Sequence, residues 1–161
     1  MAIVISVLSA GSDIMTLGEK IKQIRKFRGL TQKQLGMAIG IDDKTADIRI
    51  AQYETGIRTP KTGYKSKLAK ALKVSEINFM STKSDSIDYI AQSLFWLDEI
   101  VPIPSDALLV ELYLVRSEEK NPFTSRLAVF YKEWILMQSK LSKGVITREE
   151  YFEWKLNWTA R

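Results

Sequence analysis

Residues 31–56 read TQKQLGMAIGIDDKTADIRIAQYETG, and this stretch decides the fold. Thr31 and Gln34 form a capping box, in which each side chain satisfies a free backbone N–H group at a helix start. Gly40 ends that helix after about two turns, because glycine readily adopts the left-handed conformation of a helix end. A further helix is expected within 44–55. The stretch therefore predicts two short helices that are joined by a tight connection.

The helix expected within 44–55 has two different faces. One face carries residues suited to a core, namely Ala46, Ile50, Tyr53 and Glu54. The opposite face mixes basic, hydroxyl, amide and apolar groups, namely Lys44, Thr45, Ile48, Arg49 and Gln52. A mixed face of this kind is what a helix needs to read base edges in a major groove. Ile48 leaves two alternatives open, since it either meets a thymine methyl group or packs under the preceding turn.

Helices are also expected on both sides of this stretch. Upstream, Thr16 and Glu19 form another capping box, apolar residues recur at helical spacing, and Gly29 ends the helix. Either Asp42 or Asp43 is suited to cap the helix that follows Gly40. Downstream, another helix runs from about Lys61 to Lys73, and a short final turn follows it. Residues 16–81 therefore predict four helices and a short final turn.

Charge divides the chain into two parts. The 161 residues carry a net charge of +5, but residues 16–81 hold 14 basic and 6 acidic side chains, whereas residues 82–161 hold 10 and 12. All four tryptophans lie in the second part. A basic, aromatic-poor domain is typical of a protein that binds a polyanion. Residues 1–15 are expected to be a flexible leader, with a short strand that pairs with the C-terminal half as the alternative.

Composition excludes several kinds of site. The chain has no cysteine and no histidine, which excludes thiol nucleophiles, serine–histidine–aspartate triads, thiolate zinc sites and disulfides. No apolar run reaches the about 18 residues that a membrane-spanning helix needs. Asp42, Asp43 and Asp47 lack the spacing of a calcium loop. Composition leaves a carboxylate-only metal site or a carboxylate dyad open. We expect no enzyme, no catalytic residue, no metal, no cofactor and no membrane association.

Three blocks of residues follow one another within 16–81. The first runs from Leu17 to Gly40 through Gly29-Leu30-Thr31-Gln32, the second runs from Ile50 to Pro60 through Tyr53-Glu54-Thr55-Gly56, and the third runs from Leu68 to Ser75. Together they resemble the helix-turn-helix domain of the phage-repressor and xenobiotic-response-element (XRE) family. The resemblance implies a lambda-repressor-like fold of five helices, in which the second and third helices read DNA.

The resemblance identifies one base-reading residue. Gln52, counted back from Gly56, matches a position that contacts bases in the family. Before this position the chain has about four residues more than the usual family spacing, so positions further forward do not transfer. Base contacts by Lys44, Thr45 and Arg49 are instead inferred from the shared helical face.

Other residues are expected to bind the DNA backbone or to support the fold. Thr31 and Gln32 match the start of the second helix, where the family holds a phosphate. Arg58 and Lys61 are expected beside passing phosphates. The resemblance also implies a structural ion pair between two buried side chains, Arg25 and Glu54.

Residues 82–161 predict a separate, aromatic-rich domain. Apolar residues recur at helical intervals over 87–101 and over 127–141, and a last helix begins at Thr147. Apolar and other residues alternate over 107–115, which favours a strand, although leucine-rich runs also form helices. The predicted fold class is therefore mainly α, with a C-terminal domain that is helical or α+β.

The aromatic side chains are expected to form a core, a dimer interface or both. A ligand pocket that is lined by Trp96, Trp134 or Tyr113 is a further alternative. Residues 140–156 are similar to the short C-terminal helical-hairpin motif, which implies oligomerisation or docking. Since family members usually bind two half-sites as dimers, we expect residues 82–161 to form a homodimer and leave any small-molecule or protein effector open.

The predicted function is a cytoplasmic, sequence-specific regulator of transcription that binds double-stranded DNA, namely a dimeric repressor of the mobile-element type. The alternative is an antitoxin-like protein whose C-terminal domain docks a partner, as the net charge of −6 over residues 82–119 suggests. Self-cleavage by a serine–lysine dyad is not expected, because Ser139 and Lys140 are neighbours on a helix and their side chains diverge.

Overall fold

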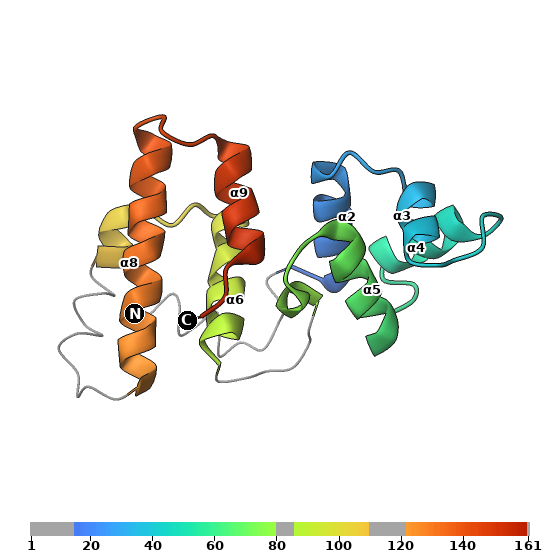
Figure 1. Ribbon diagram of the computed structural model, residues 1–161, viewed down its shortest axis with the longest axis horizontal. Helices are drawn as coiled ribbons and strands as arrows, with labels where there is room; N and C mark the ends of the chain where they lie inside the picture. The colour runs from blue at the N-terminus through green and yellow to red at the C-terminus, as the bar shows by residue number, and fades with distance from the viewer. Residues whose placement is uncertain (1–14, 80–85, 110–121, 161) are drawn as a thin grey trace. The chain divides into compact units, whose positions relative to one another are not determined.

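The structure is a computed structural model that describes residues 15–79, 86–109 and 122–160. Every regular element in these ranges is a helix (Figure 1), which confirms the predicted mainly-α fold. The described residues fall into two compact units, one within 15–79 and the other formed by 86–109 and 122–160. The leader expected at 1–15 lies outside the described residues except for Met15, and so does the domain boundary expected after residue 81.

The first unit contains four α-helices and one 3₁₀ helix within residues 15–79. They are α2 (Leu17–Phe27), α3 (Gln32–Ala38), α4 (Ala46–Glu54), α5 (Thr62–Leu72) and η1 (Glu76–Phe79). Aliphatic side chains from α2, α3, α4 and α5 fill its core, and these include Ile21, Ile24, Leu35, Ile50, Leu68 and Leu72.

Local sequence signals determine where these helices begin and end. The Thr16 hydroxyl accepts a hydrogen bond from the Glu19 N–H group, and the Thr31 hydroxyl accepts one from Gln34, so both expected capping boxes are present. Gly29 follows α2 with φ of +66°, the left-handed conformation that favours glycine after a helix. Each signal acts within a few residues of its helix end.

Two glycines allow α4 to approach its neighbours closely. A Cβ atom at Gly18 of α2 would lie 2.5 Å from the carbonyl oxygen of Tyr53 and 2.6 Å from that of Glu54. A Cβ atom at Gly36 of α3 would lie 2.6 Å from the carbonyl oxygen of Ala46. Since real Cβ atoms do not pack this closely against backbone, α4 occupies a position that larger residues at 18 and 36 would prevent.

The second unit is formed by α6 (Ile87–Ile100), α8 (Pro122–Ser142) and α9 (Arg148–Asn157), with residues 105–109 as a further helical segment. Helices α8 and α9 form a hairpin whose connection contains Gly144 (Figure 1). The aromatic side chains form the core of this unit. The Phe95 ring lies at its centre, with centroid distances of 5.1–6.2 Å to other rings, those of Phe130, Trp134, Trp154 and Trp158.

The strand expected over 107–115 is wrong where the structure describes that segment. Residues 105–109 are helical, and the Leu108 N–H group donates to the carbonyl oxygen of Pro104 over 3.3 Å. Leucine is a strong helix former, and a proline just before a helix costs nothing because its missing N–H group has no helical partner to lose. Residues 110–115 lie outside the described part of the chain.

A buried polar network joins α6 to α9. The Lys155 ammonium group lies 2.9 Å from a carboxylate oxygen of Asp98 and also contacts Glu99. The Tyr151 hydroxyl donates to Asp98 over 3.3 Å and accepts from the Trp134 indole N–H group over 2.7 Å. Burial, with the nearby Asp98 charge, raises the pKa of Tyr151 above its ordinary value, so this hydroxyl stays neutral and remains a donor.

We expect Gly18→Ala to lower the free energy of unfolding by about 1–3 kcal/mol, because the added methyl group must push α2 away from the backbone of α4. Gly63→Ala is the matched control, since Gly63 is likewise the second residue of its helix and no atom lies within 4 Å of its Cβ position. That variant should be unchanged or slightly stabilised. Urea unfolding followed by circular dichroism measures both, and equal effects would contradict the close approach.

Candidate nucleic-acid interface

A buried ion pair links α2 to the end of α4. The Arg25 side chain of α2 donates to both carboxylate oxygens of Glu54 at the end of α4, over 2.5 Å from Nε and 3.1 Å from Nη2. The two side chains are 10% and 2% exposed. The remaining Arg25 nitrogen, Nη1, donates to the carbonyl oxygen of Leu30 over 2.7 Å. The structure therefore contains an ion pair at the two positions where the sequence predicts one.

The same carboxylate also holds α3. The side-chain nitrogen of Gln32, the first residue of α3, donates to Glu54 over 2.9 Å. Glu54 therefore accepts three hydrogen bonds from two residues, one on α2 and one on α3. This network fixes the start of α3 against the end of α4.

The residues between α3 and α4 form a tight turn. The Asp42 carbonyl oxygen accepts from the Thr45 N–H group over 3.0 Å, and the Asp42 carboxylate accepts from the Lys44 N–H group over 2.9 Å. The helix runs from Ala46 to Glu54, within the expected range 44–55. The turn corrects one expectation, because the Asp42 carboxylate closes the turn instead of capping α4, whose N-cap Thr45 makes no side-chain cap bond.

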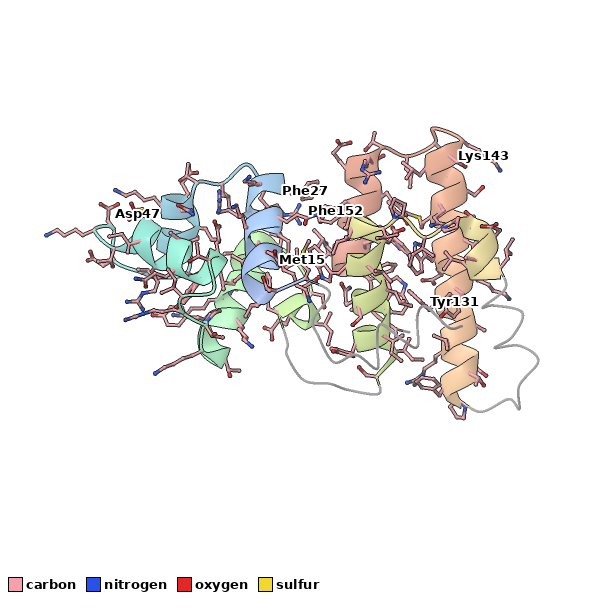
Figure 2. All side chains as sticks on the ribbon, turned by 180° about the vertical axis from the view of Figure 1, so that it is seen from behind. Met15, Phe27, Asp47, Tyr131, Lys143 and Phe152 are labelled. Carbon is pink, nitrogen blue, oxygen red and sulfur yellow. The ribbon has the colours of Figure 1, made fainter. Side chains whose placement is uncertain are left out.

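Helix α4 divides into the two faces that its sequence predicts. Its buried side chains are Ala46, Ile50, Tyr53 and Glu54. On the other side Ile48 is exposed, while Arg49 and Gln52 are half-buried. Asp47 in the first turn is also exposed, and Figure 2 labels it at this helix.

The predicted base-reading residues do not all belong to α4. Lys44 and Thr45 are exposed in the turn just before the helix, and Arg49 and Gln52 lie within it. Thr45 and Gln52 are seven residues apart, which places them on one side of the helix, about two turns from each other. The structure thus brings these four residues together along the outer side of α4 and its entry turn.

The predicted phosphate-binding residues lie at both ends of the α3–α4 pair. Thr31 is the exposed N-cap of α3, and Gln32 is half-buried because its side chain bonds Glu54. Arg58 and Lys61 are exposed beyond α4. The Arg58 N–H group donates to the carbonyl oxygen of Gln52 over 3.1 Å, which holds Arg58 next to a predicted base-reading residue.

The sequence prediction did not include Lys33. Its ammonium group lies 2.9 Å from the Asp43 carboxylate in the turn before α4, and both side chains are exposed. The hydrogen bond and the charge of Asp43 raise the pKa of Lys33, which keeps this cation charged in the first turn of α3. The sequence signal that could have identified Lys33 is its place directly after Gln32, with acidic residues in the connection that follows α3.

The described residues contain no group of three or more histidine, cysteine, aspartate or glutamate side chains that could hold a metal ion. In the same ranges, every helix is too short or too polar to cross a membrane.

We expect Glu54→Gln to lower the free energy of unfolding by about 3–5 kcal/mol, because the Arg25 charge would remain buried without a counter-charge. Asp43→Asn is the control, since it removes a partner from an exposed ion pair and should change stability little. Thermal unfolding of the two variants beside the unchanged chain provides the comparison. A small effect of Glu54→Gln would show that the buried pair does not hold the unit together.

The comparisons with known proteins bear on the first unit. Residues 21–77 match the family model described as helix-turn-helix. The matched range contains α3, α4 and α5, most of α2 and the first two residues of η1. The comparisons with curated proteins and with solved structures gave no match.

Proposed function

Residues 21–77 are a helix-turn-helix domain of the XRE type, and from this premise we propose that the protein is a non-enzymatic, sequence-specific regulator of transcription. It binds double-stranded DNA, with α4 and its entry turn in the major groove. The observation that supports this proposal is the outer side of α4, which presents hydrogen-bond donors and acceptors. The Arg25–Glu54 pair fixes the backbone of the helix that carries them.

Four residues supply the proposed contacts to bases. The Gln52 side-chain amide suits the paired donor and acceptor of adenine, while Lys44 and Arg49 suit the two acceptors of guanine. The Thr45 hydroxyl suits either adenine or guanine, because a hydroxyl group both donates and accepts hydrogen bonds. Each well-formed bidentate contact discriminates against the wrong base by about 1–3 kcal/mol.

Backbone contacts supply most of the proposed affinity. Thr31 and Gln32 at the start of α3, with Arg58 and Lys61 beyond α4, are proposed to contact phosphates on either side of the groove. The 14 basic against 6 acidic side chains of residues 16–81 support this role. Because binding releases counterions from DNA, affinity should fall steeply as salt concentration rises.

Two substitutions separate base contacts from phosphate contacts. Gln52→Ala should relax the preference at one base pair and leave the salt dependence unchanged. Lys61→Ala should weaken binding to all sequences alike and reduce the slope of affinity against salt. Fluorescence anisotropy on a panel of duplexes with single base-pair changes, repeated over a salt series, measures both effects. An unchanged base preference for Gln52→Ala, or a sequence-selective effect of Lys61→Ala, would contradict these roles.

We also propose that residues 82–161 form a homodimer and that the protein acts in the cytoplasm as a repressor of the mobile-element type. Large apolar side chains on α8 support the dimer, since Phe123, Val129 and Leu136 are exposed there. A dimer would occupy two half-sites about 34 Å apart. The α8–α9 hairpin, at the position of the predicted short C-terminal motif, supports the same role.

Selection of random duplex DNA by the full chain, at two salt concentrations, tests the proposed function. We expect a palindromic motif whose half-sites are about one helical turn apart and which persists at the higher salt concentration. A single half-site would overturn the dimer. Enrichment without any motif would overturn sequence-specific binding and favour the alternative, an antitoxin-like protein whose C-terminal unit docks a partner.

A further inference from the structure

Ile48 lies at the centre of the outer side of α4. Its side chain is 55% exposed, although isoleucine is usually found in protein cores. At about 100° per residue, Ile48 is about 180° around the helix from the middle of the buried face. Because more than half of this side chain is exposed on the outer side of α4, the placement favours contact with a thymine methyl group over packing under the preceding turn.

An exposed apolar residue alone needs no explanation. Ile57, in the turn after α4, is 75% exposed, and it does not stand between proposed base-reading residues. Ile48 differs because Thr45 precedes it by three residues and Gln52 follows it by four, and this spacing places all three on one side of the helix. The only large apolar group on that side therefore stands between two proposed base-reading residues.

One base edge in the major groove is partly apolar. Thymine presents a carbonyl oxygen and its C5-methyl group there, whereas the other three bases present no methyl group. A hydrogen-bonding side chain does not detect this methyl group, but an aliphatic side chain removes it from water. We propose that Ile48 selects a thymine near the centre of each half-site by packing against its C5-methyl group.

This inference rests on the proposed function, since it requires α4 to enter the major groove. It adds a specificity-determining residue that recognises its base without a hydrogen bond. Asp42 closes the entry turn, and this turn determines where α4 begins. The start of the helix in turn determines which residues share the outer side with Ile48. Thr45 and Gln52 would then read the base pairs that flank the thymine.

Deoxyuridine is the direct probe, because it differs from thymidine in the major groove only by the missing methyl group. Each thymidine of a duplex enriched by selection is replaced in turn, and binding to the full chain is measured. We expect about a fourfold loss of affinity at one position in each half-site, the size expected for one buried methyl group. Ile48→Ala should bind the unmodified duplex more weakly and show no further loss at that position. Ile57→Ala, the matched control, should keep the full deoxyuridine effect.

Three results would overturn the proposal, and they differ in meaning. If the unchanged chain selects a motif but ignores deoxyuridine at every position, Ile48 reads no methyl group while the DNA-binding function stands. If Ile48→Ala keeps the deoxyuridine effect, another residue contacts the methyl group. If no duplex is enriched, the proposed function fails together with this inference. A deoxyuridine scan of the unchanged chain that shows no loss at any position overturns the proposal even if Ile48→Ala does not fold.

Discussion

The Arg25–Glu54 ion pair is the interaction on which the position of α4 within residues 15–79 depends. It lies in the core, it is bidentate, and its carboxylate also accepts from Gln32. A buried pair of charges adds little net stability compared with apolar residues, but the loss of one partner is costly. Its value here is geometric, because one carboxylate fixes the end of α4 against α2 and against the start of α3.

Close packing enforces the same geometry. Gly18 and Gly36 allow the backbone of α4 to lie against both neighbouring helices. With its inner face fixed in this way, α4 has a defined outer side, and a fixed outer side is what base recognition requires. The second unit has a different construction, in which aromatic rings surround Phe95 and Asp98 pairs with Lys155.

Much of this fold could be predicted from local sequence signals. Capping boxes begin α2, α3 and α9, and glycines follow α2 and α3, because these effects act within a few residues. The exact start of α4 could not be predicted, since Asp42 is suited both to cap a helix and to close a turn. The helical segment 105–109 was missed because leucine-rich runs fit either periodicity. The Gln32–Glu54 bond was missed because it joins residues 22 positions apart.

The outer side of α4 and its flanks are the surface proposed to contact DNA. An NMR titration of the full chain with a selected duplex maps this surface, since each backbone amide reports on its own surroundings. We predict the largest shift changes at the start of α3, from Lys44 to Gln52, and from Arg58 to Lys61, with small changes over residues 86–160. Changes confined to residues 86–160, or none along α4, would contradict the account.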